Sequence, residues 1–275
     1  MKTLLIPVDF SGTSDNALRY AADFSLNNAV EKIILLKTYY VSIYEQILPS
    51  VDFVQLSSAE IELEKQSQEV RLNSYKEQLL INCKSEVQVR FSEEPMLRAI
   101  YSAVNTHTPD LLIVGSVGIQ EETYIGEHLI QIAKSVAVPV LVIPSRIKYR
   151  KIDLALIACD FRTLQGIGLL KHLRGISTWL KANIMVLNVD PDKRNLSKQQ
   201  EYESELKNLL DGYRYEVFYV HDRDIVRGIL RFADVHPVDL IVALPKRHSF
   251  FYNLTNSSIT EAIALNAHTP VLILK

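Results

Sequence analysis

The stretch "DLLIVGSVGIQEETYIGEHL", residues 110–129, joins a strand-like apolar run to a helix-like pattern through a loop that contains glycine. The run ends at Gly115, further glycines follow at Gly118 and Gly126, and apolar residues then recur at helical spacing. Such a unit can hold phosphate, because the loop N–H groups and the positive end of the helix dipole point at the anion. The stretch therefore indicates an α/β fold with an anion site, although Glu127 places a negative charge beside the last glycine.

Four segments of the first half of the chain recur in the second half in the same order. The pairs are "LLIPVDFS" (4–11) with "ALIACDFR" (155–162), "KIILLKT" (32–38) with "NIMVLNV" (183–189), "LRAIYSAVNTHTPDLLIV" (97–114) with "VRGILRFADVHPVDLIVA" (226–243), and "VPVLVI" (138–143) with "TPVLIL" (269–274). The offset falls from 151 to 129 residues, so the first half carries 22 additional residues between about 39 and 90. It then rises to 131, so the glycine loop of the first half is two residues shorter. Repeats of this length fit duplicated domains, which we predict at residues 1–146 and 150–275.

Each half alternates between strand and helix patterns. The apolar runs, such as "LLIPV", "IILLKT" and "LLIVG", lack polar alternation, as expected for a parallel sheet that helices cover on both faces. Residues 11–24 have the apolar spacing of a helix, with Ser11 or Thr13 as its cap. The pattern predicts a doubly wound α/β layer in each half. Such layers bind ligands at the carboxyl ends of the strands, where Asp9 and Gly115 lie.

Composition narrows the classes of partner. The 275 residues are 48% hydrophobic and 23% charged, and the net charge of −2 gives no reason to expect a nucleic acid or an anionic membrane surface as partner. The apolar runs fall far short of the roughly 20 residues of a membrane helix, and the N-terminal run is too short for a signal peptide. Cys83 and Cys159 have neither CxxC nor metal spacing, which fits a reducing compartment. We expect a cytoplasmic protein without a metal site.

The ordered motifs resemble the universal stress protein family. They are a strand ending in "PVDFS", the strand "DLLIVGSVG" with its loop and further glycine, and a final "VPVLVIP", and the resemblance extends over the chain as two tandem copies. It implies a five-stranded parallel sheet in each copy, with the last strands paired across a pseudo-twofold axis. For one subclass it also implies ATP held by the pattern Gly-x-x-Gly, nine residues, Gly-Ser/Thr, with an acidic residue after the first strand facing the adenosine.

The resemblance can be carried over to the first half residue by residue. Gly115, Gly118 and Gly126 match the three glycines, but only seven residues separate the second from the third, and Glu127 stands in the Ser/Thr position. The remaining residues that the resemblance makes candidates for contact with ATP or AMP are Pro7, Asp9, Thr38 and Val114. Asp9 has a second interpretation, as a residue that caps the turn before the first helix.

The equivalent pattern in the second half is degenerate. The residues at the corresponding positions are Asp160, Leu244, Arg247, Ser257 and Ser258. Leu244 carries a branched side chain where close backbone approach is wanted, so we expect no phosphate cradle here. The loop "PKRHSFF" (245–251) is either a solvated surface loop or a source of cations for an anion.

Glu127 decides how well the first half can bind a nucleotide. A carboxylate 4 Å from a phosphate charge is repelled by about 4 kcal/mol at an effective dielectric constant near 20. A charged hydrogen bond returns only about 1.5–3 kcal/mol. Near a helix N-terminus a glutamate also gains about 0.3–1 kcal/mol from the dipole. We therefore hypothesise that Glu127 acts as an internal anion in the place of a phosphate.

Three functions remain open. The chain is a non-enzymatic universal stress response protein with weak or lost nucleotide binding, an ATP- or AMP-binding signalling module, or a scaffold with an empty pocket. An ATP-hydrolysing enzyme of the same fold is disfavoured, because the sequence has no Gly-Lys-Ser/Thr loop and no His-x-Gly-His motif. The protein partners are not indicated.

Two expectations concern assembly. The segments 138–143 and 269–274 should pair near the pseudo-twofold axis, because unpaired apolar edge strands invite aggregation. The chain would then be an intramolecular pseudo-dimer, and a homodimer stays open. Residues 57–82, within the additional segment, read as a helix with a polar face that leaves room for a partner or a lid. His107 and His236 hold equivalent places and indicate helix-end packing.

Overall fold

The computed structural model of the protein describes residues 1–40, 57–116, 124–159, 170, 173, 176, 179–191, 204, 206–244 and 259–275, with only the backbone for 124–127 and 259–261. The described elements of the first half are β1 (Thr3–Val8), α1 (Gly12–Asn27), β2 (Lys32–Thr38), α3 (Ser58–Asn82), β3 (Glu86–Ser92), α4 (Met96–His107), β4 (Leu111–Ser116), α5 (Tyr124–Ser135) and β5 (Val140–Pro144). Those of the second half are β6 (Leu154–Ala158), β7 (Asn183–Val189), β8 (Tyr215–Val220), α8 (Ile225–Val235), β9 (Leu240–Ala243), α9 (Ile259–Asn266) and β10 (Val271–Ile273).

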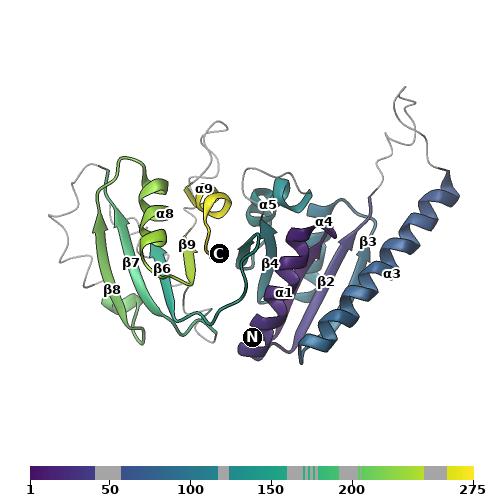
Figure 1. The fold of residues 1–275 in the computed structure, drawn as a ribbon, viewed down its shortest axis with the longest axis horizontal. Coiled ribbons are helices and arrows are strands. Elements are labelled where there is room, and N and C mark those ends of the chain that lie inside the picture. The colour runs from purple at the N-terminus through teal and green to yellow at the C-terminus, as the bar shows by residue number, and fades with distance from the viewer. Residues whose placement is uncertain are drawn as a thin grey trace, which may run out of the picture.

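The ten strands form one sheet in the order β3-β2-β1-β4-β5-β10-β9-β6-β7-β8. Each half contributes five parallel strands in the same order, since β8-β7-β6-β9-β10 repeats β3-β2-β1-β4-β5. Only β5 and β10 run antiparallel to each other. The predicted doubly wound α/β halves are therefore present, and they are joined edge to edge in one mixed sheet, as Figure 1 shows. The domain limits at residues 146 and 150 stay a prediction.

The register of the central pair reveals the pseudo-symmetry. Leu141 pairs with Leu272, its own repeat equivalent at the offset of 131, and the flanking pairs exchange equivalent residues across this centre. A local twofold axis therefore passes between Leu141 and Leu272. The predicted pairing of 138–143 with 269–274 is confirmed, and it protects two buried apolar strands that would otherwise be open edges. We call this junction the seam.

A second repeated feature fixes the start of each half. Asp110 accepts hydrogen bonds through Oδ2 from the N–H groups of Lys2 and Thr3, at 2.7 and 2.8 Å. In the second half, Asp239 Oδ2 accepts from the N–H groups of Asp153 and Leu154, both at 3.0 Å. The residues correspond at the offsets of 129 and 151, so the duplication seen in the sequence extends to individual contacts.

Helices cover both faces of the sheet and divide the core into two layers. One layer holds the apolar faces of α1 and α3, and the other holds those of α4, α5, α8 and α9. Ser11 caps α1 by accepting from the N–H of Ser14, and Ser57 and Glu60 form a capping box at the start of α3. The described α3 confirms the helix expected over 57–82, and Figure 1 shows it along the outer strand β3, far from the seam.

Two details complete the description of the helices. His236 stacks on Phe232 at the end of α8, with ring centroids 3.8 Å apart, and its Nδ1 lies 2.9 Å from the Phe232 carbonyl oxygen. This arrangement confirms helix-end packing for that histidine. Among the described residues, no helix combines the length and the apolar character needed to cross a membrane.

Candidate functional site

The candidate site lies at the carboxyl ends of β1 and β4, where the strand order of the first half reverses. The ladder between these strands pairs Leu4 with Leu111 and Leu5 with Leu112 and then stops. The carbonyl oxygen of Thr3 accepts a hydrogen bond from the N–H of Asp110, so the backbone groups of Thr3 point toward β4. Every second residue of a strand points its backbone groups to the same side, so those of Pro7 also point toward β4. Because proline has no N–H, it cannot continue the ladder on that side.

The equivalent strands of the second half remain paired to their ends. The β6–β9 ladder runs from Ala155 with Leu240 to Ala158 with Ala243. Ala158 is the repeat equivalent of Pro7, and it has the N–H that proline lacks. The two reversal points, or switch points, therefore differ: the first is unpaired beyond Leu5, and the second is closed by hydrogen bonds.

Asp9 organises the turn between β1 and α1. Its Oδ1 accepts from the backbone N–H of Ser11 at 3.0 Å and from the Ser11 hydroxyl at 2.5 Å. Ser11 Oγ also lies 2.8 Å from Thr13 Oγ1 and caps α1. These contacts support the interpretation of Asp9 as a capping residue, and they engage one of its two carboxylate oxygens.

Gly115 has a packing role at the end of β4. A Cβ atom at this position would lie 2.5 Å from Thr13 O and 2.8 Å from Thr13 C, much closer than real contacts allow. The first turn of α1 thus abuts the strand end, and only glycine permits that approach. The sequence pattern suggested that this glycine lets a phosphate come close, whereas the structure shows that it lets a helix come close.

Two cations that the sequence analysis did not single out flank Phe10, whose backbone is left-handed with a φ of 63°. The half-buried Lys37 has its Nζ 5.2 Å from the ring centroid, and Arg71 of α3 has its Cζ at 4.5 Å. Arg71 also donates to the Phe10 carbonyl oxygen at 3.3 Å. We call Lys37, Phe10 and Arg71 the cationic cluster. It places two positive charges beside Asp9 at the carboxyl edge of the sheet.

The charge of Lys37 is held in a partly desolvated place. Burial lowers the pKa of Lys37 from its ordinary value, and the nearby Asp9 carboxylate opposes that shift. Its Nζ donates to the carbonyl oxygen of Thr38 at 2.9 Å, so a predicted contact residue anchors the lysine. A lysine at the end of an apolar strand was a visible signal in the sequence. Arg71 gave no such signal, because only folding brings α3 to this edge.

The remaining predicted residues are placed as follows. Pro7 is buried in β1, and Val114 is fully buried in β4, so either strand can meet a ligand there only through its backbone. Gly126 and Glu127 lie in the first turn of α5, of which only the backbone is described. Leu244 is partly buried and packs against the core layer of α1 and α3. The predicted residues that lie outside the described part of the chain are Gly118, Asp160, Arg247, Ser257 and Ser258.

The chemistry open to this cluster is binding rather than metal chemistry at the described residues. Within the described ranges, no three side chains of His, Cys, Asp or Glu are grouped so that they could hold a metal ion. The Ser11 hydroxyl donates to the carboxylate of Asp9, as in a helix cap. Lys37 and Arg71 instead offer positive charge to an anionic group that approaches the strand ends.

Comparison with known proteins agrees with this fold. A model of the universal stress protein family matches residues 1–144. A universal stress protein from Archaeoglobus fulgidus DSM 4304 is similar at 15% identity, with a TM-score of 0.69, 99% of this chain and 96% of that chain covered. A functionally unknown protein from Pseudomonas aeruginosa PAO1 gives a TM-score of 0.58 at 15% identity, with 100% and 92% covered. No curated protein matches the sequence.

Proposed function

Because the chain belongs to the universal stress protein family, we propose that it is a non-enzymatic, cytoplasmic stress-response protein that binds adenine nucleotide weakly at its first half and not at its second. One observation carries the proposal: β1 and β4 are unpaired beyond Leu5, whereas β6 and β9 stay paired to Ala158 and Ala243. A ligand of a doubly wound sheet needs the crevice at the switch point. Only the first half has a switch point free of ladder hydrogen bonds at its outer end.

The cationic cluster supports an anionic ligand at the first half. Lys37 and Arg71 both lie close to the ring of Phe10, next to the Asp9 turn that follows β1. A phosphate oxygen that reaches either cation gains a charged hydrogen bond worth about 1.5–3 kcal/mol.

Three features argue that the binding is weak. Asp9 Oδ1 already accepts two hydrogen bonds from Ser11. Gly115 is used for the approach of α1, which removes one of the three glycines from the phosphate cradle. Glu127 adds a carboxylate in the first turn of α5, where the dipole would otherwise attract phosphate. The sum of these effects places the expected affinity for ATP near the millimolar range, about −4 kcal/mol.

Nucleotide binding at the second half is opposed by packing. Leu244, at the first glycine position of the second half, packs against the core layer of α1 and α3. At the repeat equivalent of Lys37, Asn188 is buried and donates to the carbonyl oxygen of Cys159 at 3.0 Å. In the second half, the residues at these two positions therefore form internal contacts, whereas their equivalents in the first half lie at the carboxyl edge of the sheet.

A tighter ATP- or AMP-binding signalling module is the second candidate, and the cationic cluster is the observation that favours it. The two candidates differ in affinity and in the role of Glu127. In the first, Glu127 repels the phosphates; in the second, its carboxylate points away and the cations dominate.

Calorimetric titration of ATP and AMP into the full-length protein tests the proposal. We expect a Kd of about 1 mM or weaker for wild type. Glu127→Ser should tighten binding, because it removes the repulsion and keeps a capping hydroxyl. Arg71→Gln should weaken binding severalfold, whereas Arg214→Gln, an exposed arginine of the second half, should leave it unchanged.

Phosphate release from ATP is measured in the same samples, and we expect none above the buffer rate. A micromolar Kd that Glu127→Ser does not change would replace the proposal by the signalling module. Phosphate release that disappears in Asp9→Asn would show an enzyme instead.

A further inference from the structure

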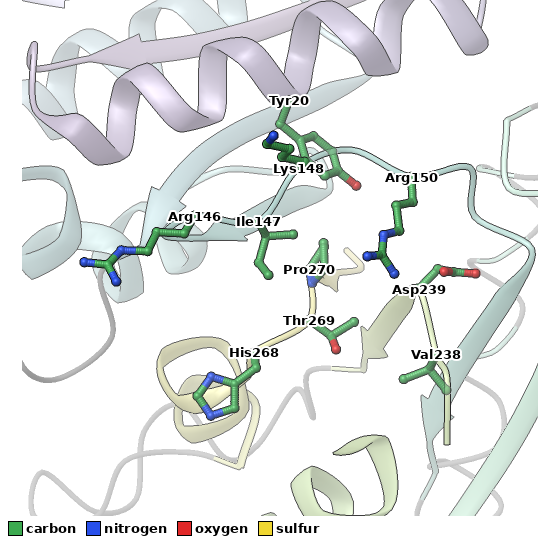
Figure 2. A pocket seen from close by; sticks show the side chains of 10 residues that line it. All are labelled: Tyr20, Arg146, Ile147, Lys148, Arg150, Val238, Asp239, His268, Thr269 and Pro270. Carbon is green, nitrogen blue, oxygen red and sulfur yellow. The ribbon is translucent and has the colours of Figure 1, made fainter. Parts of the chain in front are cut away.

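A cavity of about 340 Å³ lies beside the seam, where three distant parts of the chain meet (Figure 2). Its walls come from α1, from residues 146–150 between β5 and β6, and from the residues just before β9 and β10. We call it the seam pocket. It has no lining residue in common with the candidate nucleotide site of the first half.

The seam pocket is positively charged, although the protein as a whole has a net charge of −2. Arg146, Lys148 and Arg150 line it together with a single carboxylate, Asp239, which leaves a net charge of +2. None of the three cations forms an ion pair within the described residues, and Asp239 Oδ2 is held by the N–H groups that start β6. His268 adds a further ring nitrogen at the wall. Of the three cations, Figure 2 shows the guanidinium of Arg150 directed into the pocket, whereas the charged ends of Arg146 and Lys148 point away from it.

Tyr20 supplies a hydroxyl group at the pocket wall. The residue as a whole is only 2% exposed. Burial, followed by the charges of Tyr149 and Asp239, raises the pKa of Tyr20 well above its ordinary value, so the group remains a donor at neutral pH. Figure 2 shows the hydroxyl of Tyr20 and the guanidinium of Arg150 directed toward the same space, beside Ile147 and Pro270.

The segment that carries the cations is held in place before any ligand arrives. Asn16 of α1 donates through Nδ2 to the carbonyl oxygens of Pro144 and Ile147, at 3.2 and 3.1 Å. The ring of Tyr149 packs edge-on against Tyr20, with centroids 5.3 Å apart. A preorganised segment loses little freedom on binding, which favours affinity.

Arg146 adopts a left-handed backbone with a φ of 69°, a conformation that favours glycine or asparagine. A strained residue of this kind is maintained where the surrounding structure or a function requires its side chain. Here the neighbouring Pro144 and Ile147 are fixed by Asn16, so the surrounding structure holds this turn in place.

We propose that the seam pocket binds a small ligand that carries a phosphate group. Arginine binds phosphate oxygens in a bidentate fashion, and Figure 2 shows the Arg150 guanidinium directed to the same space as the Tyr20 hydroxyl. Tyr20 donates a hydrogen bond to the same group. The apolar wall formed by Ile147, Val238 and Pro270 contacts the rest of the ligand, so an organic phosphate binds more tightly than free phosphate.

The test uses the full-length protein and three probes: inorganic phosphate, glycerol phosphate and acetate, followed by calorimetry or by phosphorus NMR for the first two. Arg150→Gln should weaken glycerol phosphate binding at least about tenfold. Tyr20→Phe keeps the ring packing and removes only the hydroxyl, and it should weaken binding by about three- to tenfold. Arg98→Gln, an exposed arginine on α4 in the opposite core layer, is the charge-matched control and should have no effect. Circular dichroism confirms that each variant is folded.

The outcomes separate cleanly. Tighter binding of glycerol phosphate than of phosphate, weakened by Arg150→Gln and by Tyr20→Phe, supports the proposal; equal binding of the two probes would contradict the contact of the apolar wall with the rest of the ligand. Acetate binding as tight as phosphate binding, or equal losses in Arg98→Gln and Arg150→Gln, would overturn it, as would no binding at 10 mM probe, about −2.7 kcal/mol. ATP affinity at the first half should be the same in Arg150→Gln and wild type, which keeps this test independent of the proposed nucleotide site.

Discussion

The two halves of this protein have the same strand order but differ at the switch point. Three pairs of equivalent residues account for the difference: Pro7 and Ala158, Lys37 and Asn188, and Gly115 and Leu244. In the first half these residues interrupt a ladder, present a charge and admit a helix turn. In the second half they continue the ladder, bond to a strand carbonyl and fill the core. A duplicated fold can thus keep its sheet while the strand ends of the two copies take on different contacts.

The comparison also shows what both halves must retain. Both halves have an aspartate, Asp110 or Asp239, that accepts hydrogen bonds from the backbone at the start of the half. The pairing of Leu141 with Leu272 is likewise the same on both sides of the axis. These contacts hold the sheet together, whereas the residues that differ lie at strand ends. The differences between the halves therefore lie at the strand ends and not in the contacts that hold the shared sheet together.

The largest effect is expected at the seam. Leu141 and Leu272 are both fully buried and face each other across the axis. Replacing either by Ala should lower the free energy of unfolding by about 2–5 kcal/mol, through lost burial and a cavity. If the two equivalent leucines contribute equally to stability, the losses in the free energy of unfolding for Leu141→Ala and Leu272→Ala, measured by urea denaturation, should agree within about 1 kcal/mol. A much smaller loss for Leu272→Ala would show that the second half does not depend on the seam.

Gly115→Ala should have the next largest effect. The new Cβ would meet the backbone of Thr13, which cannot move aside like a side chain, so we expect a loss of about 1–3 kcal/mol from overpacking. The control is Gly12→Ala, at the start of the same helix, where nothing lies within 4 Å of the added atom. That change should be neutral or slightly stabilising. Equal thermal midpoints for Gly115→Ala and wild type would refute the packing role assigned to Gly115.

Lys37→Met should have the smallest effect on stability. Unlike the substitutions at the seam and at Gly115, it should raise the free energy of unfolding. Folding lowers the pKa of Lys37 by burial, so the charged form is disfavoured in the folded protein at neutral pH. Replacement by Met should raise stability at pH 7 by less than about 1 kcal/mol, because solvent screens a half-buried charge. The difference should shrink as the pH rises toward and beyond the ordinary value of 10.5, where lysine is neutral in both states.

Urea denaturation of wild type and Lys37→Met between pH 7 and 11 measures this difference. Lys207→Met, at an exposed lysine of the second half, is the control and should show no such pH dependence. A difference that grows with pH would mean that the lysine charge stabilises the fold. ATP titration of Lys37→Met should show weaker binding than wild type, the reverse of its effect on stability.

Much of the fold could be predicted because it is recorded in local patterns and in the repeat. Apolar runs without alternation predicted parallel strands, and the cost of unpaired apolar edges, together with the family resemblance, predicted that 138–143 and 269–274 pair at the seam. The helix over 57–82 was expected from its run of charged residues with a polar face, and the structure adds the capping box of Ser57 and Glu60. These features depend on neighbours in the chain or on comparison of the chain with itself.

The candidate site could be predicted only in outline. Asp9 and Gly115 were expected near one another at the carboxyl edge, and they lie there, but their contacts are with Ser11 and Thr13. A glycine that admits a helix turn and a glycine that admits a phosphate look the same in a sequence. The same ambiguity holds for an aspartate that caps a turn and one that meets a ribose.

The sequence by itself determined the duplicated α/β architecture and the degenerate second motif at Leu244, because periodicity and self-similarity along the chain suffice for these. Only the tertiary structure decided that Arg71 lies on Phe10 across 61 residues, that the β1–β4 ladder stops before Pro7, and that Tyr20 lies beside Arg150 in the seam pocket. The physical reason is that these contacts join elements far apart in the chain. Their strength depends on packing distance and burial, which no local pattern records.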